Sequence, residues 1–186
     1  MHTHRLLVLA CSATKTDSPG RIPALERYNG PLWQTLRTVD PDSSLASVAS
    51  LSARYGFRDV RDPIADYNMR LTPSFAQTMI AGGVDARWPA SPWARSRTPR
   101  MPIGDHAGCH ISRITDYGDR PVTEVALVGG HLYLEVMRTL VIGFQQMRCV
   151  TLRASVIEIN GPIGRMRQEL RSWLLATSSN SLPVAA

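Results

Sequence analysis

Short apolar runs, each followed by a loop of small or polar residues, set the pattern of the chain. Runs at residues 5–10, 45–53 and 123–130 have the length of buried strands, and residues 147–154 form a fourth candidate. Between them lie segments with helical spacing, so helices are predicted to begin at Pro23 or Pro31, Thr72, His131 and Pro162. Strands that alternate with helices predict an α/β fold: a single domain with a mostly parallel central sheet flanked by helices.

Three stretches interrupt this alternation. Residues 54–71 are predicted to form a long loop because they carry turn residues and no sustained periodicity. Residues 84–120 are rich in proline, arginine and tryptophan and are predicted to be an irregular insertion. The polar residues 177–186 are expected to form a disordered tail, which leaves a single α/β domain over residues 1–176.

Composition narrows the function classes. The 186 residues suit one domain, and 44% of them are hydrophobic, which is enough for a core. No apolar run reaches the roughly 20 residues of a membrane span, and the first run is too short for a signal peptide. We therefore expect a cytoplasmic protein with no membrane partner. The net charge of +6 favours an anionic partner such as a nucleotide, DNA or RNA.

The cysteines and histidines give no metal signature. The three cysteines, Cys11, Cys109 and Cys149, form no CxxC pair. Asp105-His106 and Cys109-His110 look superficially like metal ligands but lack a paired spacing. We expect neither a metal nor a cofactor.

The first candidate site follows the first strand and contains Cys11, Ser12 and Lys15. Lys15 is the chain's only lysine among 21 basic residues. Unlike arginine, a lysine can lose its proton and act as an amine nucleophile. The loop can also hold a phosphate or carboxylate, with Lys15 as counter-charge. The alternative is a capped turn whose lysine points into water.

Two further candidate sites also follow strands. After the second strand come Ser52, Tyr55 and Gly56, and the same loop returns Asp66 and Tyr67. The tyrosines can stack on a base and Asp66 can act as a general base, although tyrosines that simply anchor the loop on the core are an alternative. The third site is Gly129, Gly130, His131 and Tyr133 at a strand-to-helix junction. There the backbone can approach an anion, and His131 can act as an acid or base or cap the turn.

The insertion carries ingredients of a nucleic-acid contact, namely cations for phosphates and flat rings for bases. The residues concerned are Arg87, Trp88, Trp93, Arg95, Arg97 and Arg100. The alternative is a proline-rich cover whose tryptophans pack on the core.

Five short motifs in this order resemble a family of small, uncharacterised bacterial and phage domains that is similar to the YaaA peroxide-stress proteins. They are Cys11-Ser12-x-x-Lys15, Tyr28-x-Gly30-Pro31-Leu32-Trp33, Leu51-Ser52-Ala53-x-Tyr55-Gly56, Ile64-x-x-Tyr67 and Gly129-Gly130-x-x-Tyr133. The first motif also resembles the lysine motif of archaeosine synthase, in which a lysine amine adds to a modified base. The resemblance implies a base-sized pocket lined by Cys11, Ser12, Lys15, Tyr28, Ser52, Tyr55, Gly56, Tyr67, Gly129, Gly130 and Tyr133.

Two classes of function remain. The first is an enzyme that acts on a nucleobase, nucleotide or nucleic-acid base by N-glycosidic bond cleavage or base transfer, with Lys15 and Asp66 as catalytic residues. The second is a non-enzymatic DNA-binding protein, as in a stress response, or a phage accessory protein that binds a protein partner through the insertion.

Overall fold

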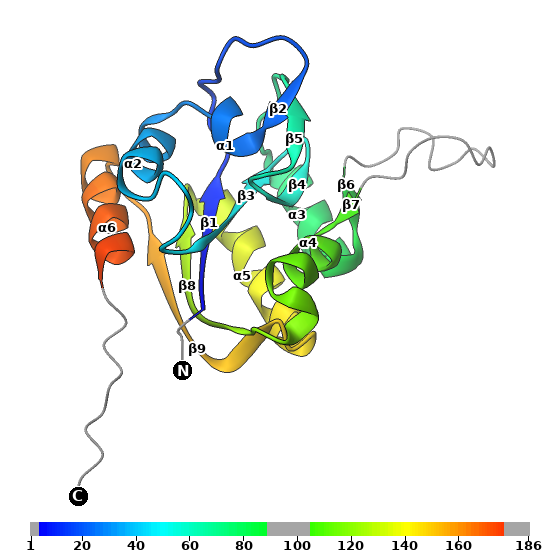
Figure 1. Cartoon of the computed structure of the whole chain (residues 1–186). Coiled ribbons are helices and arrows are strands. Elements are labelled where there is room, and N and C mark those ends of the chain that lie inside the picture. The colour runs from blue at the N-terminus through cyan, green and yellow to red at the C-terminus, as the bar shows by residue number, and fades with distance from the viewer. Residues whose placement is uncertain (1–3, 89–104, 177–186) are drawn as a thin grey trace, which may run out of the picture.

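A five-stranded sheet forms the centre of the computed structural model, which describes residues 4–88 and 105–176 (Figure 1). The strand order is β4-β3-β1-β8-β9. Parallel pairing joins β1 to β3, β1 to β8 and β8 to β9, whereas β4 runs antiparallel to β3 at one edge. The bounds are β1 (Arg5–Ala10), β3 (Ser47–Ser52), β4 (Gly56–Asp59), β8 (Val122–Val128) and β9 (Val150–Ile159). The predicted α/β fold with a mostly parallel sheet is confirmed.

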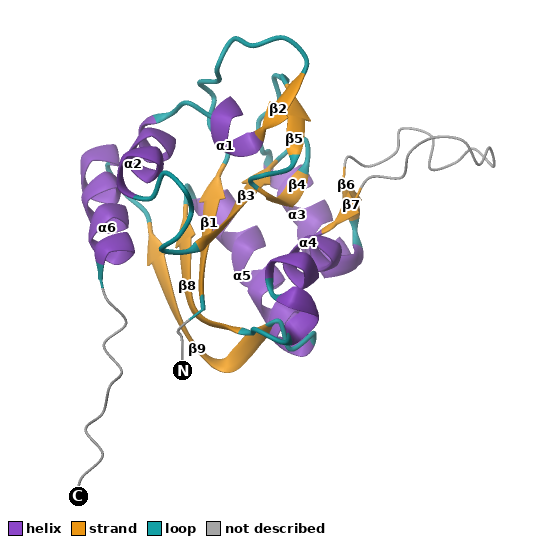
Figure 2. Ribbon diagram, viewed as in Figure 1, coloured by secondary structure: helices purple, strands orange, loops and turns teal. Residues whose placement is uncertain are grey.

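Helices cover both faces of this sheet (Figures 1 and 2). Leu6 and Val8 of β1 belong to the apolar core beneath α3 (Pro73–Gly82), α4 (Ala107–Ile114) and α5 (His131–Gln146). Leu7 and Leu9 face the other core, beneath α2 (Pro31–Val39) and α6 (Ile163–Leu175). A central parallel strand is therefore buried on both sides, which is why its sequence is a continuous apolar run.

The helix starts follow the expected local chemistry. Pro31 opens α2 and Pro73 opens α3. The Thr72 hydroxyl caps α3 by accepting a hydrogen bond from the Phe75 N–H at 3.3 Å. Proline fits the first helical turn because that turn needs no N–H donor, and threonine satisfies one of the free N–H groups.

The prediction of one long loop over residues 54–71 is wrong in two places. Residues Gly56–Asp59 form β4 at the sheet edge, and Pro63–Ala65 form β5, which pairs antiparallel with β2 (Arg21–Pro23). The single turn α1 (Ala24–Arg27) follows β2. The β2–β5 pairing joins segments about 40 residues apart, so no local periodicity indicates it, whereas β4 forms a hairpin with the preceding strand β3.

The prediction of irregular structure over residues 84–120 also needs correction. The described part contains β6 (Arg87–Trp88), β7 (Asp105–His106), helix α4 and the short 3₁₀ turns η1 (Gly83–Asp85) and η2 (Asp116–Gly118). Helix α4 is stabilised by burial of Ile111 and Ile114 against the sheet. Residues 89–104 lie outside the described residues, as does the expected tail at 177–186.

Among the residues that the structure describes, none of the helices combines the length and the apolar character that a membrane crossing requires.

Candidate functional site

The carboxyl ends of β1, β3 and β8 lie at the same end of the sheet, because these strands run parallel. The backbone continues in register past β1, where the Cys11 N–H donates to the Leu51 carbonyl at 2.8 Å. The Gly129 N–H likewise donates to the Ile159 carbonyl at 3.2 Å. The loops that carry Lys15, Tyr55 and the two glycines therefore start side by side, although they are far apart in the sequence.

Two glycines allow these segments to approach closely. A Cβ on Gly30, which precedes α2, would overlap the Ser12 hydroxyl. A Cβ on Gly129 would meet the side chains of Ala10 and Tyr133. Glycine at these positions lets the first loop pack against the start of α2 and lets β8 turn sharply into α5.

Lys15 lies within this group of loops and is half-buried. Its backbone forms an isolated antiparallel bridge with Tyr28. Its Nζ lies 4.4 Å from the centre of the Tyr67 ring, which is the distance of a cation–π contact. The alternative of a lysine that points into water is therefore not what the structure shows.

Arg27 anchors the loop that carries Lys15 through hydrogen bonds to backbone carbonyls. Its fully buried guanidinium donates to the carbonyls of Thr16, Ser18 and Gly20 at 2.7–2.9 Å. The Asn29 N–H adds a bond to the Thr14 carbonyl at 2.9 Å. This role could not be predicted from the sequence, because Arg27 is one of many arginines and its three acceptors are backbone groups.

Four phenol rings and one thiol lie in the same region, and Lys15 contacts them through the Tyr67 ring. The hydroxyls of Tyr28 and Tyr67 are 2.8 Å apart, and the Tyr133 hydroxyl lies 3.1 Å from the Cys11 sulfur. Tyr55 packs edge-on to Tyr67 with 5.3 Å between ring centres. We name this group the tyrosine cluster: Cys11, Lys15, Tyr28, Ser52, Tyr55, Tyr67 and Tyr133.

Burial controls the protonation of these phenols. It raises the pKa of Tyr28, Tyr67 and Tyr133 well above the ordinary value of 10.0. The Ser52 hydroxyl opposes this rise in the pKa of Tyr28 and Tyr67. The phenols therefore stay protonated at neutral pH, and their hydroxyls pair with one another and with the Cys11 thiol. Tyr28 and Tyr55 are buried in the core, as the loop-anchor alternative predicts, whereas Tyr67 and Tyr133 are half-buried.

Several predicted residues lie outside this cluster. Asp66 is exposed, and its carboxylate accepts a hydrogen bond from the Tyr67 N–H at 2.8 Å. His131 is also exposed and forms an ion-pair contact of 3.2 Å with Glu135, one turn later in α5. Gly130 is exposed, and Gly56 has a positive φ of 66° at the turn into β4.

The predicted nucleic-acid contact through Trp88 needs correction. Trp88 is buried, its ring lies against Gly56, and its carbonyl accepts a hydrogen bond from Arg58 at 2.9 Å. A ring held in the core cannot stack on a base. Arg87 is exposed. The other four residues of that prediction, Trp93, Arg95, Arg97 and Arg100, lie outside the described residues.

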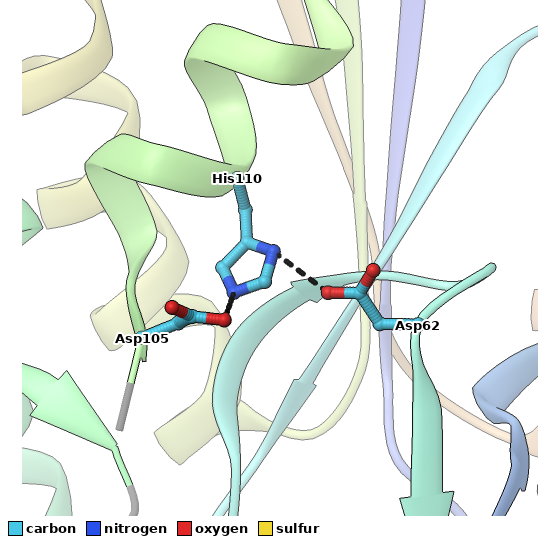
Figure 3. A group of neighbouring side chains, drawn as sticks. All are labelled: Asp62, Asp105 and His110. Atoms are coloured by element: carbon cyan, nitrogen blue, oxygen red, sulfur yellow. Dashed lines mark ion pairs between the residues drawn. The ribbon is translucent and has the colours of Figure 1, made fainter. Parts of the chain in front are cut away.

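A second polar cluster joins Asp62, Asp105 and His110 (Figure 3). The fully buried His110 ring lies between the two carboxylates, with Nδ1 3.1 Å from Asp62 and Nε2 3.7 Å from Asp105. Arg113 lies 3.3 Å from Asp62 and Arg58 lies 3.7 Å from Asp105. Each carboxylate thus already has a guanidinium beside it, which disfavours a divalent cation, and we assign no metal here.

This second cluster is an ion-pair network. A hydrogen bond from His110 and the nearby guanidinium groups of Arg113 and Arg58 hold the pKa of the Asp62 carboxyl below its ordinary value. Asp62, in the connection between β4 and β5, is thereby bound to His110 and Arg113 of α4.

No protein-family model, curated protein or solved structure matches the chain.

Proposed function

We propose that this chain is an enzyme that acts on a nucleobase-containing substrate, by N-glycosidic bond cleavage or base transfer, at the tyrosine cluster. One observation carries the proposal: the only lysine of the chain places its Nζ 4.4 Å above the Tyr67 ring, at the edge where three parallel strands end. In open α/β sheets, ligands bind beyond the carboxyl ends of the strands.

The chemistry of the lining supports a base-sized ligand. The half-buried Tyr67 and Tyr133 supply the accessible aromatic surface, and their protonated hydroxyls can donate hydrogen bonds to the ring nitrogens or carbonyls of a base. In a cleavage reaction, the Lys15 amine attacks the anomeric carbon of the sugar. The bond from that carbon to the base then breaks, and the electron pair leaves with the base.

Asp66 and the two glycines at the start of α5 have the remaining roles in this proposal. Asp66, next to Tyr67 in the chain, is the carboxylate that would accept the proton from the attacking amine. The backbone at Gly129 and Gly130 would approach a phosphate, since this junction forms the N-terminus of α5.

Activity assays with single-residue variants test this proposal. The protein is incubated with nucleosides, nucleotides and single- and double-stranded DNA and RNA, and free base is measured by chromatography. Lys15→Ala should reduce base release by more than about a hundredfold. Lys15→Arg keeps the charge but cannot attack, so it should retain binding and lose turnover. Arg153→Ala removes an exposed cation on β9 and is the control.

Covalent trapping identifies the nucleophile. If the amine displaces the base, the sugar ring can open to an imine on Lys15, which water hydrolyses to complete the turnover. Borohydride reduction of that imine should leave a sugar adduct on Lys15 and none in Lys15→Arg. Full activity in Lys15→Ala would overturn the mechanism. The alternative, a non-enzymatic DNA-binding protein, requires binding that weakens steeply with salt and no base release from any substrate.

A further inference from the structure

Cys109 and His106 form a close pair at the start of α4, on elements that contribute nothing to the tyrosine cluster. The Cys109 sulfur lies 3.0 Å from His106 Nε2. Cys109 is the only exposed cysteine of the three, since Cys149 is buried and Cys11 is half-buried against Tyr133. Its thiol is therefore the one that a reagent in solvent can reach.

The partners of the His106 ring allow two positions for its hydrogen. His106 is the N-cap of α4, and in the first form its Nδ1 accepts a hydrogen bond from the Cys109 N–H at 3.3 Å. A neutral histidine that accepts at Nδ1 carries its hydrogen on Nε2. In this form the ring donates that hydrogen to the Cys109 sulfur.

The second form of the ring carries its hydrogen on Nδ1 and donates it to the Val84 carbonyl at 3.2 Å. In that form Nε2 is the acceptor for the S–H proton of Cys109. In either form the ring contacts the sulfur through Nε2, and Cys109 occupies the first turn of the eight-residue helix α4.

Gly108 keeps the ring in this position. A Cβ on Gly108 would lie 3.1 Å from His106 Nδ1 and 3.3 Å from the Met147 methyl group. Glycine thus leaves space for the imidazole to fold over the first turn of the helix and reach the sulfur.

From these contacts we infer that Cys109 is a nucleophilic thiol and the site at which this protein forms a mixed disulfide with a small disulfide from solution. The Cys109 thiolate attacks one sulfur of the small disulfide. A new S–S bond forms, the S–S bond of the reagent breaks, and the departing thiolate takes up a proton, which His106 can supply. The inference is independent of the proposed function, because it involves no residue of the tyrosine cluster.

The experiment follows the reaction of the full chain with an aromatic disulfide, dithiobisnitrobenzoate, at neutral pH. Absorbance gives the rate of thiolate release and peptide mass mapping gives the modified residue. We expect a fast phase that releases one equivalent of thiolate and is absent in Cys109→Ser. The modification formed in this phase should map to Cys109 and should be removed by dithiothreitol.

A conservative variant separates reactivity from folding. His106→Asn keeps a good N-cap but removes the imidazole, so it should slow the fast phase about tenfold while leaving the helix intact. His131→Asn changes an exposed histidine on α5 and should react as the wild type does. A fast phase that maps to Cys11 or Cys149, or one that keeps its rate in His106→Asn, would overturn the inference.

Discussion

The hydroxyl oxygens of Tyr28 and Tyr67 lie 2.8 Å apart, although 39 residues separate the two tyrosines in the chain. Tyr28 is fully buried and its ring also packs on Trp33. Tyr67 receives the Lys15 ammonium on its ring face, 4.4 Å from the ring centre. This hydrogen bond therefore connects Tyr28, in the core beneath α2, to Tyr67, which contacts the proposed nucleophile Lys15.

Removing that hydrogen bond should cost stability. Tyr28→Phe deletes the hydroxyl and leaves the Tyr67 hydroxyl without this partner, so the free energy of unfolding should fall by about 1–2 kcal/mol. Urea denaturation measures the change. Tyr117→Phe deletes an exposed hydroxyl and should leave the midpoint unchanged. Equal effects of the two substitutions would contradict the role given to the buried pair.

The contact between Gly30 and Ser12 gives a prediction about the first loop. Gly30→Ala places a methyl group on the Ser12 hydroxyl, so it should displace the loop and weaken any activity that depends on Lys15. Gly164→Ala is the control, because a Cβ there meets nothing within 4 Å. Ser12→Ala in the same chain removes the oxygen and should partly restore the stability lost in Gly30→Ala. Additive losses in the double variant would show that the two residues do not interact.

Arg27 should be among the most sensitive arginines of the chain. Arg27→Met keeps an unbranched apolar stem but leaves the carbonyls of Thr16, Ser18 and Gly20 without their donor. We expect a loss of about 2–4 kcal/mol in the free energy of unfolding. Arg153→Met, on the exposed side of β9, should change stability by less than about 0.5 kcal/mol. Thermal and urea unfolding of both variants measure the difference.

The Asp62 network predicts a pH dependence of stability. The pKa of Asp62 is lower in the folded chain than its ordinary value of 3.8, because His110 hydrogen-bonds to the carboxylate and Arg113 and Arg58 lie nearby. A depressed folded-state pKa contributes stability above the unfolded-state pKa, and this contribution is lost as the pH falls through the folded-state value. Asp62→Asn should therefore be less stable than the wild type at neutral pH, with the two curves converging in acid.

Urea midpoints between about pH 6 and pH 3 check this prediction. Parallel curves for wild type and Asp62→Asn across that range would mean that ionisation of this carboxylate does not contribute to folding stability.

Much of the fold follows from local sequence. The run at residues 5–10 becomes β1 because a strand buried on both faces needs apolar residues at every position. Thr72-Pro73 becomes a helix start because hydroxyl and imino acid both suit a first turn. Three further elements follow from local sequence in the same way. Helix α2 begins at Pro31, strand β8 is the apolar run before Gly129, and helix α6 follows the Asn160-Gly161-Pro162 turn.

Pairing and packing decided what the local pattern could not. β5 pairs with β2, about 40 residues earlier in the chain, and β4 is a four-residue strand, too short to show an alternation of its own. Helix α4 lies just after a proline-rich stretch and is stabilised by burial of Ile111 and Ile114. Trp88, which resembles a surface ring in a basic segment, is buried for the same reason: the sheet edge supplies an apolar surface that the sequence does not display.

The sequence by itself determined where β1, β3 and β8 end, to within about two residues, and the types of side chain that follow them, because these depend on short runs of neighbouring residues. The predicted strand at residues 147–154 is β9, which continues to Ile159. Which side chains meet was decided by the tertiary structure. Parallel strands bring their carboxyl ends to one edge, and so Lys15 lies over Tyr67 whereas Asp66 and His131 face solvent.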